Sequence, residues 1–166
     1  MCRSFDDLSH EVINVSVLER NQNDIYKSVI IYKADNPNQV LKANPSVGSS
    51  SECHCSSIGK CLLAFGRDVD LSVYEAHPLS VYTEYTISTV EKLKEELQDV
   101  REKGYAIDRE ELELGLTCIG APILDRSGHA IAAISLSGPK SRMLAGDFCE
   151  RVRAVTEAAR KISANF

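Results

Sequence analysis

A chain of 166 residues with 43% hydrophobic and 26% charged residues has the size and composition of one ordinary globular domain. Its formal net charge of −5 argues against a general electrostatic attraction to nucleic acid. It has no apolar run of the roughly 18 residues that a transmembrane helix needs, and its first residues lack the apolar core of a signal peptide. We therefore expect a cytoplasmic protein without a membrane partner, in which the six cysteines are reduced.

The first part of the chain predicts an antiparallel meander. Residues 1–10 are polar and are expected to form a lead-in, so the domain is expected to run from residue 11 to residue 166. Apolar and β-branched residues then predict three strands, separated by turns at residues 21–24 and 35–38. The strands are Val12–Leu18, Ile25–Ala34 and the shorter Gln39–Ala43, followed by a loop at residues 44–52 that is rich in Pro, Gly and Ser.

Three helices are predicted next. Apolar residues at positions 58, 61, 62 and 65 lie on one face of a helix over Ser56–Phe65, for which Ser56 or Ser57 is the expected cap. A short helix is expected at residues 70–77, ending before a proline. Residues 88–91 (Ser-Thr-Val-Glu) match a capping box and predict a third helix, which Gly104 ends.

A β-hairpin dominates the second half of the chain. Leu116–Leu124 and His129–Ser137 read as two buried strands, and the turn Asp125–Gly128 has the residues that a type I turn prefers at its first and last places. A last helix is expected over residues 143–165. Strands, helices, strands and a final helix in this order indicate an α+β fold with a central, largely antiparallel sheet.

Polar side chains interrupt the two buried strands of this hairpin. They are Cys118, Ser135 and Ser137, and Asp108 stands shortly before the first strand. Residues two apart in a strand share a face, so the two serines point the same way. A buried hydroxyl without a partner costs about 1–3 kcal/mol. The pair therefore predicts either contacts to the backbone or a cavity that holds a polar ligand.

Three stretches of the chain carry a resemblance to a known family. They are residues 55–64 (Cys-Ser-Ser-Ile-Gly-Lys-Cys-Leu-Leu-Ala), 104–111 (Gly-Tyr-Ala-Ile-Asp-Arg-Glu-Glu) and 115–123 (Gly-Leu-Thr-Cys-Ile-Gly-Ala-Pro-Ile). With the Ser-x-Ser strand that follows, their order resembles the C-terminal effector-binding domain of the IclR family of bacterial transcription regulators. The resemblance extends over residues 11–166 and implies a GAF-like (profilin-like) fold, with helices on both sides of a sheet of about six strands.

The resemblance also implies a function. It implies a domain that senses a small molecule within a DNA-binding transcription regulator, without enzymatic activity and without a cofactor. The resemblance implies that the whole regulator joins a winged helix-turn-helix to such a domain, as regulators of this family do. We expect this chain to lack the DNA-binding part, so that only the missing N-terminal domain contacts DNA. We also expect the chain to associate with itself as a dimer or tetramer.

The helix at residues 56–65 and the hairpin supply the candidate effector site. Free N–H groups and the dipole at a helix start favour an anion, and the two serines are small enough to let a carboxylate approach; the alternative is an ordinary helix cap. The matching positions of the family contact the carboxylate of the effector, and the family places the other polar positions around one cavity. We therefore expect a small oxo acid or sugar acid to bind at Ser56, Ser57, Asp108, Cys118, Ser135 and Ser137.

Other readings of these residues remain open at this level. Cys53, His54 and Cys55 are zinc-ligand types that Asp108 and Cys118 could complete, although adjacent residues do not easily converge on one ion. A small thiol hydrolase would use Cys118 with His54 or His129, although no motif supplies an oxyanion hole. A third reading is a pure oligomerisation module. The charged residues Arg109, Glu110, Glu111 and Glu113 are expected to form a solvated face.

Overall fold

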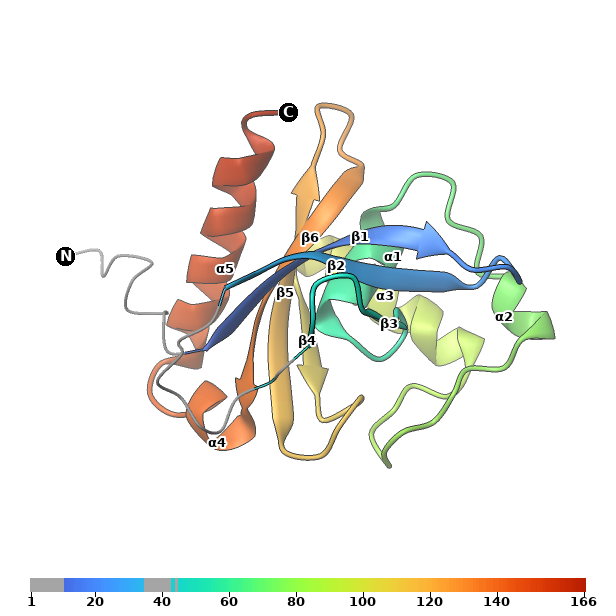
Figure 1. The fold of residues 1–166 in the computed structure, drawn as a ribbon, viewed down its shortest axis with the longest axis horizontal. Coiled ribbons are helices and arrows are strands. Elements are labelled where there is room, and N and C mark those ends of the chain that lie inside the picture. Colours follow the sequence, from blue (N-terminus) through green and yellow to red (C-terminus); the bar gives the residue numbers. More distant parts are fainter. Residues whose placement is uncertain (1–10, 35–42, 44) are drawn as a thin grey trace.

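The computed structural model describes residues 11–34, 43 and 45–166. Their centre is one antiparallel sheet of six strands in the order β3-β2-β1-β6-β5-β4 (Figure 1). The strands are β1 (Val12–Arg20), β2 (Tyr26–Ala34), β3 (Ser50–Glu52), β4 (Ala106–Arg109), β5 (Leu116–Leu124) and β6 (Ala130–Pro139). The helices are α1 (Ser57–Phe65), α2 (Val73–Ala76), α3 (Val90–Lys103), α4 (Lys140–Met143) and α5 (Phe148–Ser163). The predicted α+β class with a six-stranded antiparallel sheet is confirmed.

The hairpin of β5 and β6 is the inner part of this sheet, and its tight turn follows from one aspartate. The Asp125 carboxylate accepts hydrogen bonds from the backbone N–H groups of Ser127 and His129 at 2.8 and 3.1 Å. Gly128 takes the positive φ of 81° that the turn requires and that a residue with a Cβ rarely adopts. This local chemistry fixes the register of two strands that carry no charged residue and are buried along most of their length.

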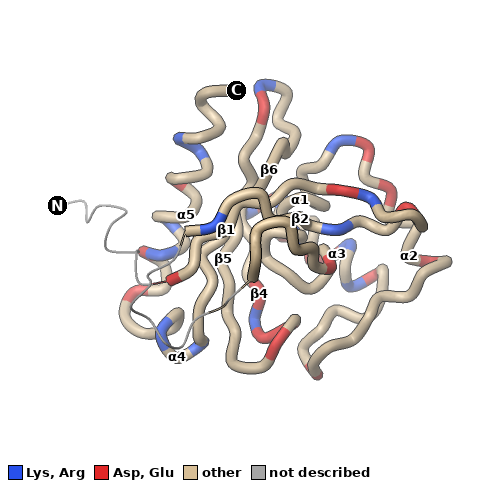
Figure 2. The backbone as a smooth tube through the Cα atoms, in the orientation of Figure 1, with Lys and Arg blue, Asp and Glu red and all other residues tan. Residues whose placement is uncertain are grey.

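The two faces of the sheet are covered by different helices. Helix α5 lies along one face and packs on β5 and β6, whereas α1 packs on the other face and α3 packs on α1 (Figure 1). The core under α5 is apolar and includes Ile119, Leu136 and Val155. The core on the α1 side includes Leu62, Leu93 and Leu97. Figure 2 places most of the charged residues on helices, loops and outer strands, away from β5 and β6.

Several predicted elements differ from the structure. Residues 50–52, predicted as loop, form the edge strand β3, and β4 was not predicted as a strand at all. Helix α3 begins one residue later than the capping box suggests, because Thr89 rather than Ser88 accepts the capping hydrogen bond from the N–H of Lys92. The final helix, predicted over residues 143–165, begins only at Phe148 as α5, and the short helix α4 ends at Met143. Gly146 takes a positive φ of 69° in the break.

The remaining helical predictions hold in part. Ser56 caps α1 as expected, whereas the helix predicted at residues 70–77 is confined to Val73–Ala76. The predicted turn at residues 35–38 and most of the strand Gln39–Ala43 lie outside the described residues, so they stay predictions. No helix of the described part is long and apolar enough to cross a membrane.

Candidate functional site

A band of polar side chains crosses four strands of the sheet on the face toward α1. The strand register places Asp108 of β4 opposite Cys118 of β5, and Cys118 opposite Ser137 of β6. Two residues earlier on β6, Ser135 lies opposite Asn14 of β1. Residues two apart in a strand share a face, so these residues form two neighbouring rows. Strands far apart in the sequence therefore present their polar groups to one region.

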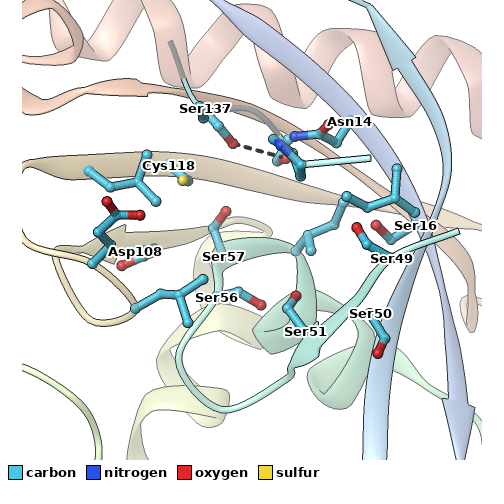
Figure 3. Close-up of a pocket in the computed structure, with 18 of the residues that line it drawn as sticks. Asn14, Ser16, Ser49, Ser50, Ser51, Ser56, Ser57, Asp108, Cys118 and Ser137 are labelled. Carbon is cyan, nitrogen blue, oxygen red and sulfur yellow. Dashed lines mark hydrogen bonds between the residues drawn. The ribbon is translucent and has the colours of Figure 1, made fainter. Parts of the chain in front are cut away.

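This region is a cavity of about 680 Å³ between the sheet and the start of α1 (Figure 3). Its volume lies within the roughly 300–1,000 Å³ typical of small-molecule sites. The structure brings all of the effector-site candidates named from the sequence to its wall, together with two residues of β1 that sequence reasoning missed. The candidates are Ser56, Ser57, Asp108, Cys118, Ser135 and Ser137, and the additional residues are Asn14 and Ser16.

The start of α1 forms one wall of the cavity. The Ser56 hydroxyl donates to the carbonyl of Glu52 at 3.0 Å and accepts from the N–H of Gly59 at 3.2 Å, so the Ser56 side chain is occupied as the helix cap. The N–H groups of Ser57 and Ile58 precede the first hydrogen bond within the helix, which Lys60 makes to Ser56. What α1 presents toward the cavity is therefore backbone N–H and the Ser57 hydroxyl.

Two glycines allow close packing around the start of α1, Gly120 on the sheet beneath it and Gly59 in the helix against the segment that precedes it. A Cβ at Gly120 of β5 would lie 2.7 Å from the carbonyl carbon of Ser57, and a Cβ at Gly59 would lie 2.4 Å from the Cα of Cys53. Real Cβ atoms essentially never come within 3.0 Å of such neighbours, so larger residues would displace backbone at both places. The N-terminus of α1 is thus fixed directly over β5, beside Ser135 in the neighbouring strand.

Asp108 has two carboxylate oxygens in different situations. Its Oδ1 accepts a hydrogen bond from the N–H of Glu111 at 2.8 Å, whereas its Oδ2 is buried and has no hydrogen-bond partner. Burial raises the pKa of the Asp108 carboxyl to about 7, against the lowering effect of that hydrogen bond and with a further contribution from the Glu111 carboxylate. Near neutral pH the group can therefore either donate or accept a hydrogen bond at the cavity wall.

Asn14 and Ser16 are the residues that sequence reasoning missed. The Asn14 side chain is 5% exposed and Ser16 is 0% exposed, yet Asn14 Oδ1 and Ser16 Oγ have no hydrogen-bond partner. Buried polar groups nearly always have a hydrogen-bond partner, so we expect a molecule bound in the cavity to supply one to each of these two atoms. The sequence did not mark them as buried, because polar residues that alternate with apolar ones, as along β1, are typical of a strand with one face in solvent.

A buried lysine stands behind the cavity. The Lys60 amine, at 0% exposure, donates to Glu111 at 2.8 Å, to Glu96 at 2.7 Å and to the carbonyl of Ile107 at 2.7 Å. Burial alone lowers the pKa of Lys60, but the two carboxylates outweigh burial and raise it. Glu111 is 6% exposed, so its predicted place on a solvated face is wrong. The ion cluster ties α1 to α3, β4 and the segment that follows β4.

The charges around the cavity are negative. Its charged lining residues in the described part of the chain are Asp108 and Glu113, and no lysine or arginine lines it there. An anion in this cavity would therefore rely on backbone N–H groups, the helix dipole and neutral side chains rather than on an ion pair. A protonated Asp108 would add a hydrogen-bond donor and remove a repelling charge.

The described residues do not support the two alternative readings, a zinc site and a thiol hydrolase. The described residues contain no group of three or more His, Cys, Asp or Glu placed to hold a metal ion. His54, one of the zinc candidates with Cys53 and Cys55, instead places its Nε2 2.8 Å from the carbonyl oxygen of Ser80. Burial and the nearby Asp108 carboxylate raise the pKa of the Cys118 thiol. A thiol in this environment stays protonated and is a weak nucleophile.

The comparisons with known proteins agree with this architecture. Residues 2–164 match the family described as "Bacterial transcriptional regulator IclR C-terminal". The chain belongs to the IclR family of bacterial transcription regulators. It is 34% identical to the HTH-type transcriptional regulator BhcR of Paracoccus denitrificans (strain Pd 1222), over 98% of this chain and 57% of that protein. It is 36% identical to the HTH-type transcriptional regulator KdgR of Escherichia coli (strain K12), over 98% of this chain and 60% of that protein. The IclR-family chain thus spans little more than half the length of these two relatives.

Solved structures give the same result for the fold. The transcriptional regulator YaiJ matches with a TM-score of 0.82 and 30% identity, over 96% of this chain and 89% of that one. The inducer-binding domain of the PobR transcription factor from Acinetobacter, a double mutant in complex with 3-hydroxybenzoic acid, matches with a TM-score of 0.77 and 26% identity. That match covers 92% of this chain and 87% of the PobR chain. The likeness supports the fold of the IclR C-terminal domain for this chain.

Proposed function

We propose that this chain, over residues 11–166, is the effector-sensing part of a transcription regulator and that its cavity binds a small carboxylate, of the oxo-acid or sugar-acid class. The observation that carries the proposal is the cavity itself, where the start of α1 meets a band of buried polar side chains. Hydroxyl, thiol, amide and carboxyl groups line it, and such groups bind the hydroxyl and oxo groups of a small acid.

The acid group of the ligand would lie at the N-terminus of α1. There the N–H groups of Ser57 and Ile58 are free of intrahelical partners, and the helix dipole favours a negative charge. Ser135 and Ser137, whose hydroxyl oxygens are 3.4 Å apart, lie close enough to each other to donate to one ligand group. Asp108 would bind a ligand hydroxyl through its unpartnered oxygen, and Cys118 would form a weakly polar part of the wall.

The 3-hydroxybenzoic acid bound by the PobR domain is also a small carboxylate with a hydroxyl group. This is a property of that protein, and it supports the choice of ligand class without identifying the effector of this one. The relatives BhcR and KdgR are named as transcription regulators rather than as enzymes. We therefore propose that the ligand is bound and released unchanged.

The remaining partners follow from the same proposal. The relatives named as HTH-type regulators are longer than this chain, which carries a net charge of −5. We propose that operator DNA is bound by a part of the protein outside this chain, and that the domain associates with itself as a dimer or tetramer in the cytoplasm. Salt-dependent, sequence-selective DNA binding by this chain alone would contradict the first statement, and a monomer in sedimentation at high micromolar concentration would contradict the second.

The site is tested by a screen followed by substitutions. A thermal-shift screen of two- to six-carbon oxo acids and sugar acids identifies a ligand, and calorimetry then gives its affinity. A hydrogen bond to a charged group contributes about 1.5–3 kcal/mol, so Ser135→Ala should weaken binding about tenfold to a hundredfold if the carboxylate reaches it. Ser57→Val should do as much by blocking access to the backbone.

Ser141→Ala is the matched control, because Ser141 is exposed and does not line the cavity. It should leave the affinity unchanged. If Ser135→Ala and Ser57→Val both leave the affinity unchanged as well, the carboxylate does not bind here. Consumption of the ligand during the measurement would instead favour an enzyme.

A further inference from the structure

The polar groups without partners lie at two separate places in the cavity. One is the Asp108 carboxyl on β4, beside the start of α1. The other is formed by Asn14 and Ser16, which are two residues apart on β1 and share its inner face. Figure 3 places Asp108 and Ser16 on opposite sides of the view, with Ser57 between them. The cavity thus has two polar ends.

The strand order sets the distance between the start of α1 and the second end. Ser57 lies over Gly120 of β5, and the register continues from Gly120 to Ser135 of β6 and to Asn14 of β1. Two strand spacings of about 4.8 Å place Asn14 roughly 10 Å from Gly120 along the sheet. A two- or three-carbon acid bound at the start of α1 is too short to reach Asn14 and Ser16.

The chemistry of the second end selects a group that donates a hydrogen bond. Asn14 Oδ1 is an acceptor, and Ser16 Oγ can donate or accept. A ligand hydroxyl can donate to the amide oxygen and accept from the serine at the same time. A carboxylate only accepts hydrogen bonds, so it cannot supply the donor that Asn14 Oδ1 lacks.

We propose that Asn14 and Ser16 are specificity-determining residues that bind the terminal hydroxyl of an elongated hydroxy acid, whose carboxylate lies at the start of α1. This rests on the function proposed above and adds the length and the far-end group of the effector. The terminal hydroxyl and the carboxylate are separated by about four to six carbon atoms, which matches the spacing of the two ends.

Pairs of acids that differ only in the terminal hydroxyl test this inference. The probes are 6-hydroxyhexanoate with hexanoate, and glycolate with acetate as the short pair, each titrated by calorimetry into the full chain. A neutral hydrogen bond contributes about 0.5–1.5 kcal/mol, so the hydroxyl should strengthen binding about threefold to tenfold in the long pair. In the short pair the hydroxyl cannot reach Asn14 and Ser16, so substitutions at these residues should leave the ratio of the glycolate and acetate affinities unchanged.

Substitutions assign that preference to β1. Asn14→Leu and Ser16→Ala should each reduce the ratio of the two long-acid affinities toward one, because each removes a hydrogen-bond partner of the terminal hydroxyl. The matched control is Ser28→Ala, a buried serine of the neighbouring strand β2 that does not line the cavity, and it should preserve the ratio. A far-UV spectrum and a thermal melt of each variant establish that it is folded.

The outcomes separate this inference from the proposed function. If the long acids bind and Ser57→Val weakens them, but the hydroxyl gives no gain or the gain survives both β1 substitutions, the inference fails and the site stands. If only two- or three-carbon acids bind, the inference also fails and the site stands. If no acid of either length binds at millimolar concentration and no acid of the wider screen shifts the melting temperature, both fail.

Discussion

The two faces of strands β5 and β6 differ in how they are packed. On the face toward α5, β5 and β6 present apolar side chains such as Ile119 and Leu136, which belong to the core that α5 covers. On the face toward α1 the alternating residues are small or polar, as with Cys118 and Ser135, and they leave a cavity of about 680 Å³. The face toward α5 stabilises the fold by close packing, whereas the face toward α1 is packed less closely and forms the candidate binding site.

The cavity side is stabilised by ionic contacts as well as by apolar burial. Lys60 lies under α1 with no exposed surface and binds two carboxylates. The core under α5 is aliphatic instead. The difference predicts that the two sides will respond differently to loss of a charge, a methyl group or a hydroxyl.

The largest effect is expected from Lys60→Met. It leaves the carboxylates of Glu111 and Glu96 close together without their cation, and breaking a buried ion pair in this way costs about 3–5 kcal/mol. The free energy of unfolding, measured with urea, checks this. The control is Lys103→Met on the surface of α3, whose exposed pair with Asp99 contributes less than about 1 kcal/mol.

The double variant Lys60→Met with Glu111→Gln should recover part of the loss, because it removes one of the two unpaired charges. A Lys60→Met protein as stable as the wild type would mean that the ion cluster does not support the cavity side.

The second effect compares neighbouring residues of β6. Leu136→Ala removes a fully buried side chain from the α5 face and should lower the free energy of unfolding by about 2–5 kcal/mol. Ser135→Ala, one residue away on the cavity face, should change it by less than about 1 kcal/mol, since its hydroxyl has only a weak 3.4 Å contact to Ser137. Equal losses would mean that the cavity face is packed as tightly as the other.

The third effect concerns pH and Asp108, and each pH unit should change the free energy of unfolding by less than Lys60→Met or Leu136→Ala does. The pKa of its carboxyl rises from 3.8 to about 7 on folding because of burial, so the folded state holds a proton that the unfolded state has released between these values. Its contribution to stability is therefore fully present below about pH 4 and is lost as the pH rises to 7, at no more than about 1.4 kcal/mol per pH unit. Above pH 7 the contribution no longer changes.

Asp108→Asn should remove this slope, and urea unfolding at several pH values of wild type and variant measures the difference. The affinity for a carboxylate should fall through the same pKa in the wild type, because the ionised Asp108 repels it, and should not fall in the variant. Identical pH profiles of the two proteins would exclude Asp108 as the titrating group.

The long patterned elements were predictable from the sequence, and the short ones were not. The hairpin of β5 and β6 has nine and ten residues in its strands and a turn with strong local signals. Strands β3 and β4 have three and four residues, too few for a pattern of alternation to identify them. They exist because their neighbours in the sheet offer hydrogen bonds, which is information that the chain order alone does not contain.

The site was predictable where polar residues stood in apolar strands. Ser135 and Ser137 violated the pattern of a buried strand, and the structure places both on the cavity. Asn14 and Ser16 obeyed the pattern of a half-exposed strand, so nothing in β1 marked them as buried. Lys60 likewise occupied an ordinary polar position of a helix. Only the packing of α1 on the sheet, which depends on contacts distant in sequence, turns these residues inward.

The two oxygens of Asp108 connect the cavity to the rest of the molecule. Oδ1 holds the amide of Glu111, whose carbonyl accepts from the Thr86 hydroxyl at 2.6 Å and whose carboxylate binds Lys60. A ligand that binds Oδ2 should alter the strength of the Oδ1 contact, because both oxygens belong to one carboxyl group. The exchange of the Glu111 amide proton with deuterium thus reports occupancy of the cavity from outside it.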